Sequence, residues 1–186
     1  MSLGDTDLRS DRTGSPEAFL LDDPEASHVY AWLFKHQPAT VEEYLKRVDA
    51  NERQARLAVT RLHAHGLLAE TERGYEVEPI HGVVEGVHVT PGVAAVVAKQ
   101  LENYAVRKLV RRHGVLALAR IVEHRPRIRD GSLSSREVGE VVGIGEHDGV
   151  TATNAVRSVE EYLDLDPHLD EITAGVETES ATVGHD

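Results

Sequence analysis

Apolar residues recur at helical spacing in two short runs that are separated by a two-residue break. The first run covers residues 40–48, where Thr40 and Glu43 have the spacing of a capping box at a helix N-terminus. Asn51, another residue type that caps helices, opens the second run over residues 51–65. This pattern predicts a short helix, a sharp turn and a longer helix.

The longer predicted helix has one apolar stripe and a clear end. Its apolar residues fall at i, i+3, i+4 and i+7, the spacing of a single buried face: Ala55, Ala58, Val59 and Leu62. Gly66 then suits a helix C-terminus, because glycine readily takes the left-handed conformation found there. Residues 67–71, 72–74 and 75–77 have the pattern of strand, tight turn and strand, which predicts a small β-hairpin.

A different face of the same helix carries polar side chains that suit contact with DNA. It consists of Arg53, Arg56, Thr60 and His63. Arginine binds guanine or phosphate, and threonine contacts a base edge or a thymine methyl group. Glu52 and Gln54 lie in the first helical turn, where base contacts concentrate, and Arg73 lies in the hairpin turn. The alternative is a solvated face on a domain that binds protein.

The remaining pattern divides the chain into segments. Residues 1–21 are polar with little periodicity and are expected to form a flexible arm. Residues 22–80 form the helix-and-hairpin domain, and residues 81–91 are a Gly- and Val-rich linker, with an extra strand pair as the alternative. Residues 92–166 are expected to form a helical C-terminal region, followed by an acidic tail over residues 167–186. The predicted fold class is mainly α with a small β-hairpin.

A long helix is expected from residue 92 to about residue 112. We expect its apolar side chains to include contacts of a homodimer, namely Val96, Val97, Leu101 and Tyr104. The alternative is that they pack against the N-terminal domain or the C-terminal part of their own chain.

Positive charge is concentrated beside the predicted domain. Residues 79–129 carry nine basic and three acidic residues, whereas residues 130–186 carry two basic and 14 acidic ones. Arg107, Arg111 and Arg112 share one side of the expected long helix with Lys108 and are expected to contact DNA phosphates or another anionic partner. The alternative is that the basic segment forms ion pairs with the acidic C-terminal part, within the chain or across a dimer.

A second helix–turn–helix pattern covers residues 134–163, with glycines in its turn. Its outward positions include Thr153, Asn154 and Arg157, but acidic residues crowd the end of its second helix. Because phosphates repel such a helix, we expect this pair to pack or dimerise. DNA contact is the alternative.

The amino-acid composition indicates the kind of organism and the cellular compartment of the protein. The net charge is −12, four of the 20 basic residues are Lys and the rest are Arg, and there is no Cys. This balance is typical of proteins from salt-in halophilic archaea, where acidity maintains solubility in high salt; the alternative is an ordinary acidic bacterial protein. The chain has no long apolar run and no start resembling a signal peptide, so a cytoplasmic protein is expected.

Motifs for catalysis or for metal binding do not stand out. The 11 His residues include no H-x-x-x-H or H-E-x-x-H spacing, and no glycine-rich phosphate loop or G-x-S-x-G motif occurs. We therefore expect neither an enzyme nor a cofactor or metal site. The sequence leaves open whether a small-molecule effector exists.

Residues 24–78 resemble the winged helix-turn-helix domains of ArsR, MarR and TrmB-like transcriptional regulators. The resemblance is carried by the capped second helix, by the run from Leu62 to Leu68 (LHAHGLL) and by the hairpin that follows. The whole chain is similar to haloarchaeal proteins that join such a domain to a helical C-terminal region. The resemblance implies a cytoplasmic, homodimeric protein that binds double-stranded DNA and regulates transcription. It leaves two alternatives, a winged-helix protein-docking module and a plasmid-maintenance repressor or antitoxin.

Overall fold

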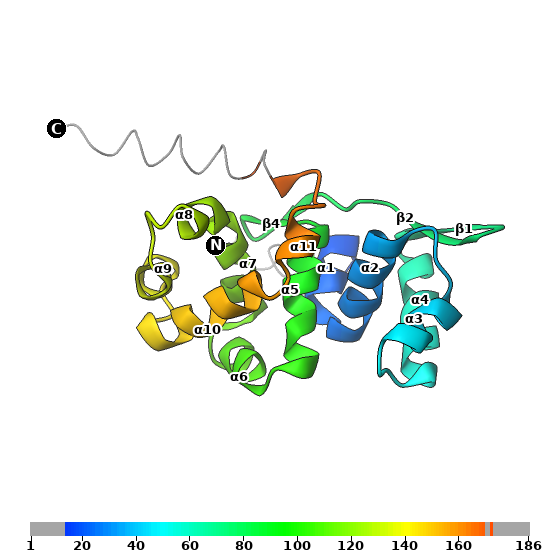
Figure 1. Cartoon of the computed structure of the whole chain (residues 1–186), viewed down its shortest axis with the longest axis horizontal. Helices are drawn as coiled ribbons and strands as arrows, with labels where there is room; N and C mark the ends of the chain where they lie inside the picture. Colours follow the sequence, from blue (N-terminus) through cyan, green and yellow to red (C-terminus); the bar gives the residue numbers. More distant parts are fainter. Residues whose placement is uncertain (1–13, 170–171, 173–186) are drawn as a thin grey trace, which may run out of the picture.

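The computed structural model describes residues 14–169 and residue 172, and it is mainly α-helical with two small antiparallel sheets (Figure 1). The expected fold class, mainly α with a small β-hairpin, is confirmed. The N-terminal half contains α1 (Pro16–Asp22), α2 (Pro24–His36), α3 (Val41–Arg47), α4 (Glu52–Ala64), β1 (Leu68–Thr71) and β2 (Gly74–Val77). The C-terminal half contains β3 (Gly82–Val84), β4 (Val87–Val89), α5 (Pro91–Glu102), α6 (Tyr104–His113), α7 (Val115–Glu123), α8 (Arg125–Arg129), α9 (Ser135–Val142), α10 (Glu146–Arg157) and α11 (Glu160–Leu163).

The two capped helices α3 and α4 form as predicted. The Thr40 side chain accepts a hydrogen bond from the Glu43 N–H, and the Glu43 carboxylate accepts one from the Thr40 N–H, which completes the capping box of α3. At the start of α4 the Asn51 side chain accepts a bond from the Gln54 N–H. Gly66 follows the end of α4 with a φ of +72°, so the expected glycine at the C-terminus is confirmed.

The hairpin of β1 and β2 is tied to the segment that precedes α3. Its strands pair with Leu68 opposite Val77, and an isolated bridge joins Tyr75 to Ala39. Gly74 has a φ of +127°, and a Cβ there would lie 2.6 Å from the carbonyl carbon of Ala39. Only glycine fits at this contact, which fixes the hairpin beside the start of α3.

α2 is the central helix of the N-terminal half. It packs against α4 on one side and α5 on the other (Figure 1). The Tyr30 hydroxyl donates to the Glu78 carbonyl and accepts a hydrogen bond from the Ile80 N–H, which anchors the chain that leaves the hairpin. The buried side chains of this core include Leu20, Tyr30, Trp32, Leu33, Tyr44, Leu62 and Ala94.

Two segments expected to lack regular structure form elements. Within the expected arm, α1 is capped by Ser15 and buries Leu20 and Leu21; residues 1–13 lie outside the described part. For residues 81–91 the alternative, an extra strand pair, is correct: β3 and β4 form a hairpin whose Val87 and Val89 are fully buried and which packs against α7. In the expected arm the apolar residues pack against elements distant in sequence, so local periodicity does not reveal α1. Of the expected acidic tail, Leu169 and Ile172 are buried, and most of the rest is not described.

The long helix expected from residue 92 is two helices. Asn103 ends α5, and its side chain accepts hydrogen bonds from backbone N–H groups in the first turn of α6. Val96 and Val97 are fully buried in the chain's own core, so the expectation that they form dimer contacts is wrong and packing within the chain is correct. Tyr104, by contrast, is 69% exposed.

The second helix pair, α9 and α10, packs as expected, although its boundaries differ. Gly139 and Gly149 lie at the crossing, where a Cβ on Gly139 would approach the Gly145 carbonyl oxygen to 2.2 Å. Thr153, expected to face outward, is fully buried. The chain then turns near residue 158 before α11, and the arginine-rich segment after α7, expected to be a loop, forms α8.

Candidate nucleic-acid interface

α4 has a buried apolar face and an exposed polar face. The residues that bury it against α2, α3 and β1 are Ala55, Ala58, Val59 and Leu62, as the sequence predicts. Arg53, Gln54, Thr60 and His63 are exposed. Leu57, which is 48% exposed, lies four residues after Arg53 and three before Thr60, so it shares their face. Sequence reasoning missed Leu57, although its place outside the buried stripe was visible.

Arg56 lies beside this face, but two carboxylates already pair with its charge. Its Nε donates to Glu52 at 3.0 Å, and its Nη2 donates to Glu42 on α3 at 2.9 Å. A hydrogen bond from its own backbone N–H, and then the bond from Arg56, lower the pKa of Glu42. Ion pairs between such exposed groups contribute little to stability, so a phosphate group can replace them at small cost.

The N-terminal end of α4 forms a shallow hollow that is open to solvent. Asn51, Glu52, Arg53 and Arg56 line it. Within the described part of the chain, Arg53 has no carboxylate partner at ion-pair distance. Its guanidinium is therefore available to an anion, whereas Glu52 in the same hollow is held by Arg56.

Arg73 lies at the turn of the β1–β2 hairpin and is exposed. The Thr71 hydroxyl shapes this turn, because it donates to the Gly74 carbonyl at 2.8 Å and accepts from the Arg73 N–H at 3.3 Å. No ion pair holds the Arg73 side chain among residues 14–169. Glu70 and Glu72 are exposed on the same hairpin and oppose its charge toward an anion.

The basic side chains expected on α6 are of two kinds. Some have partners within the chain, and others have no partner among the described residues. Arg107 donates to the carbonyls of Gln100 and Leu101 at 3.0 and 3.1 Å, which completes the C-terminal end of α5. Arg112 forms an ion pair with Asp148 of α10. Arg111 is exposed, and no carboxylate of the described chain pairs with it. The group is therefore partly structural.

Asp148 is a structural acceptor that sequence reasoning missed. It is buried and accepts hydrogen bonds from Arg112 and from Nε2 of His113, the latter at 2.8 Å. Although burial acts to raise it, the pKa of Asp148 is lowered because His113 and Arg112 donate these bonds. The expected alternative, pairing of the basic segment with the acidic C-terminal part, is thus correct for Arg112.

The same alternative is correct for α8. Arg125 is 7% exposed and donates to Glu160 at 2.7 and 3.0 Å and also to Asp164. Arg129 pairs with the same two carboxylates at 3.3 and 3.2 Å. These four side chains join α8 to α11 across about 35 residues of sequence, a distance at which no local pattern indicates a partner.

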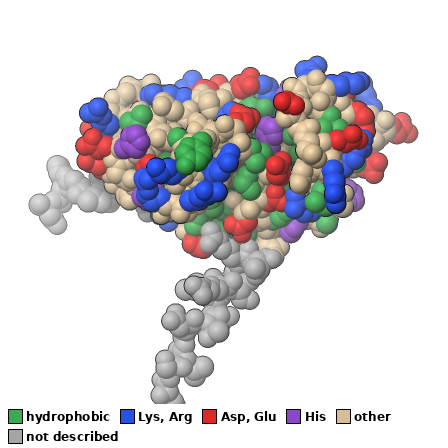
Figure 2. Space-filling view, turned by 90° about the horizontal axis from the view of Figure 1, so that it is seen from below, with side chains coloured by type: hydrophobic (Ala, Val, Ile, Leu, Met, Phe, Trp, Pro, Cys, Tyr) green, Lys and Arg blue, Asp and Glu red, His purple; other side chains and the backbone are tan. Residues whose placement is uncertain are grey.

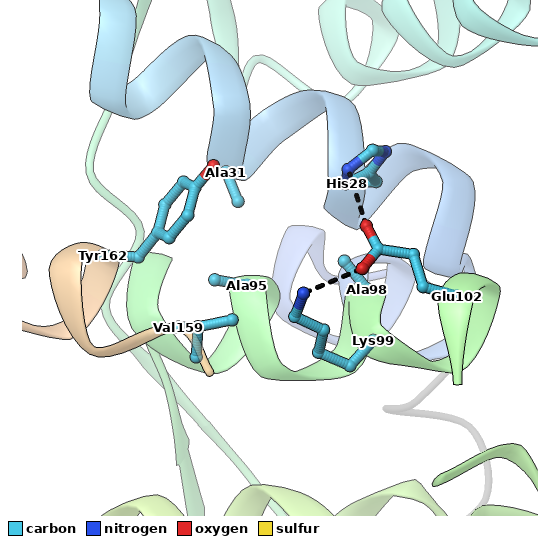
Figure 3. A pocket seen from close by; sticks show the side chains of 8 residues that line it. All are labelled: His28, Ala31, Ala95, Ala98, Lys99, Glu102, Val159 and Tyr162. Atoms are coloured by element: carbon cyan, nitrogen blue, oxygen red, sulfur yellow. Dashed lines mark hydrogen bonds and ion pairs between the residues drawn. The ribbon is translucent and has the colours of Figure 1, made fainter. Parts of the chain in front are cut away.

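A cavity of about 50 Å³ lies where α2 and α5 meet the segment around α11 (Figure 3). The His28 Nε2 lies 3.7 Å from Glu102, which also accepts a hydrogen bond from Lys99 at 2.8 Å. The Tyr44 hydroxyl lies 2.8 Å from the Nδ1 of His28, and burial lowers the pKa of His28 even though Glu102 acts in the opposite direction. This volume suits one or two water molecules rather than a drug-sized ligand.

Comparison with models of protein families, with curated proteins and with solved structures found no match for the chain. Among residues 14–169 and residue 172, no helix has the length and apolar character needed to cross a membrane. Over the same residues no three His, Asp or Glu side chains are grouped so that they could hold a metal ion.

Proposed function

We propose that this protein is a sequence-specific DNA-binding regulator of transcription, and that α2, α3, α4 and the β1–β2 hairpin form a winged helix-turn-helix. The observation that carries the proposal is the exposed polar face of α4, where Arg53 and Thr60 lie on the side opposite the buried stripe. The order of the elements supports the same conclusion, because a short capped helix, a tight turn, a second capped helix and a hairpin follow one another.

In this proposal the N-terminal half of α4 enters the major groove. Arg53 makes a bidentate contact with guanine, Gln54 suits adenine, and Thr60 and Leu57 suit a base edge or a thymine methyl group. Arg73, from the hairpin, reaches a phosphate or the adjacent minor groove. Binding exchanges the contacts of Arg56 with Glu42 and Glu52 for a contact with the DNA backbone.

The test is DNA pull-down sequencing from the source genome at native salt, with the wild type beside Arg53→Ala/Arg56→Ala. We expect a discrete motif for the wild type and its loss in the double variant, because each bidentate base contact contributes about 1–3 kcal/mol of discrimination. Arg120→Ala/Arg136→Ala removes the same charge from exposed positions on α7 and α9 and is the matched control. A palindromic motif with half-sites about one helical turn apart would indicate a homodimer.

The proposal is overturned if the double variant enriches the same motif as the wild type, or if neither protein enriches any motif. The second candidate, a winged-helix protein-docking module, would then take its place. Two observations favour that candidate: Leu57 is 48% exposed in the middle of the α4 face, and Glu70 and Glu72 flank Arg73. Salt separates the two, since DNA affinity falls steeply with salt while an apolar protein interface persists.

A further inference from the structure

We propose that α6 carries a second nucleic-acid-binding face, which holds the phosphate backbone of duplex DNA without reading its sequence. The face consists of Tyr104, Lys108 and Arg111. The inference rests on the proposed function for the identity of its partner, but it concerns different residues on a different helix.

α6 is strongly two-sided. Val106 and Leu109 are buried on its inner side, whereas Tyr104, Lys108 and Arg111 are exposed at i, i+4 and i+7, which places them in one row along the helix. Tyr104 is 69% exposed, a large fraction for an aromatic side chain, and α6 contains no acidic residue. The row therefore has no partner among residues 14–169 and residue 172, and it combines an aromatic ring with two positive charges.

The two cations of this row are not used to hold the fold. Arg107 and Arg112, their neighbours on α6, have partners within the chain. Lys108 and Arg111 have no ion pair with any residue of the described chain. Because Arg107 donates to neutral carbonyls, it keeps an unneutralised charge that strengthens the positive potential beside the row.

The α6 face lies on the same side of the molecule as the N-terminal end of α4. In Figure 1, α6 and the turn between α3 and α4 both lie along the lower edge, and Figure 2 looks at the molecule from that side. It shows Lys and Arg side chains gathered around an exposed hydrophobic side chain (Figure 2). A hollow between the two regions is lined by residues 48–51 and by Leu101 and Glu102, so the N-terminal end of α4 and the chain leading into α6 lie on its two sides.

The hollow itself is a poor place for a phosphate. Glu25, Asp49 and Glu102 line it and would repel one. DNA contact is therefore expected on its two flanks, at Arg53 on one side and along the α6 row on the other.

The chemistry of the row matches a phosphate backbone. Lysine, arginine and the tyrosine hydroxyl all donate hydrogen bonds to phosphate oxygens. The row spans seven residues, or about 10 Å of helix, and over that length one strand of duplex DNA presents about three phosphates. Three donors thus face about three acceptors whose spacing does not depend on base sequence.

The test is a salt titration of duplex binding by fluorescence anisotropy, with the motif duplex and a scrambled duplex, over salt concentrations at which circular dichroism shows each protein folded. We expect Lys108→Gln/Arg111→Gln to reduce the slope of log affinity against log salt by about 1.8 and to weaken binding roughly tenfold near 0.2 M salt. The loss should be equal on both duplexes. Tyr104→Phe, which keeps the ring but removes the hydroxyl, should weaken binding a few-fold.

Arg120→Gln/Arg136→Gln is the charge-matched control and should leave the slope unchanged. If the α6 double variant matches the wild type while the wild type binds a motif, the α6 inference is overturned and the proposed function stands. If the wild type enriches no motif but binds duplexes of arbitrary sequence with a slope that the α6 variant reduces, the inference stands and the proposed function fails. If the wild type binds no duplex, both fail, and an acidic protein becomes the candidate occupant of the α6 face.

Discussion

The arginines that join separate helices of the C-terminal half have different surroundings from those on the exposed face of α4 and in the β1–β2 hairpin. In the C-terminal half Arg112, Arg125 and Arg129 pair with carboxylates of α10, α11 or the turn after α11. In the N-terminal half Arg53 and Arg73 are exposed without such partners in the described chain. The half with the higher density of positive charge in the sequence therefore uses several of its arginines to hold its own helices together.

This difference teaches that a count of local charge does not identify a binding surface. Residues 79–129 contain nine basic side chains, yet several of them are held by acidic residues or carbonyls elsewhere in the fold. A positive side chain that the fold leaves unpaired is a better starting point in the search for such a surface. Arg53 on α4 and the α6 row meet this condition among the described residues, whereas Arg112 does not.

Removing an arginine that pairs with carboxylates of the fold should have the largest effect on stability. Arg125→Ala leaves Glu160 and Asp164 with Arg129 alone, and we expect a loss of about 2–3 kcal/mol in the free energy of unfolding. The value is below that for fully buried pairs because both acids are partly exposed. Urea denaturation at constant salt measures it.

Arg53→Ala is the control for this comparison. As an exposed side chain without an ion pair, it should change stability by less than about 0.5 kcal/mol. Equal losses of stability in Arg125→Ala and Arg53→Ala would contradict the distinction between arginines that pair with carboxylates of the fold and arginines that do not.

The Asp148 contacts should give a smaller effect that depends on pH. Asp148→Asn weakens the hydrogen bonds from Arg112 and His113 and should cost about 1–2 kcal/mol at pH 7. The ordinary pKa of 3.8 is lowered in the folded protein, so this stabilisation is fully present above about pH 4 and is lost as pH falls through the lowered value. Unfolding of wild type and variant at pH 7, 5 and 3 measures the difference, and a difference that persists undiminished at pH 3 would contradict the assignment.

The prediction with the smallest expected effect tests whether Arg56 contacts DNA. Glu42→Gln removes the α3 carboxylate from its ion pair with Arg56, and because both side chains are exposed the stability should hardly change. DNA affinity should rise a few-fold, because Arg56 no longer has this competing partner and one negative charge leaves the interface. Glu140→Gln on α9 removes the same charge from an exposed site as a control. Affinity that is unchanged or lower would show that Arg56 does not contact DNA.

Local sequence chemistry was sufficient where caps and periodicity act over a few residues. Thr40, Asn51 and Gly66 each marked a helix end correctly, and the buried stripe of α4 followed from its spacing. The break at Asn103 had the same kind of signal, since asparagine is a frequent N-cap. It was missed because apolar residues continue at helical spacing on both sides.

Features that depend on contacts distant in sequence were not predictable in this way. Leu20 and Val87 lie in segments that look irregular locally, and they are buried only because α2 and α7 pack against them. For the candidate site, the exposure of Arg53 followed from its face on α4, but the pairing of Arg112 required Asp148, 36 residues away. The helical spacing of Val96 and Val97 also predicts that they are buried, but it does not indicate which part of the fold covers them.

The packing of α2 has a practical consequence for dissecting this protein. α2 lies between α4 and α5, and Ala94 of α5 belongs to the same core as Tyr30 and Leu62. A fragment that stops after the hairpin would therefore leave an apolar side of α2 uncovered and should aggregate. The helix–hairpin unit is not a cassette that can be cloned by itself, and a fragment that ends after α5 would in turn uncover Val96 and Val97, which are buried in the C-terminal core.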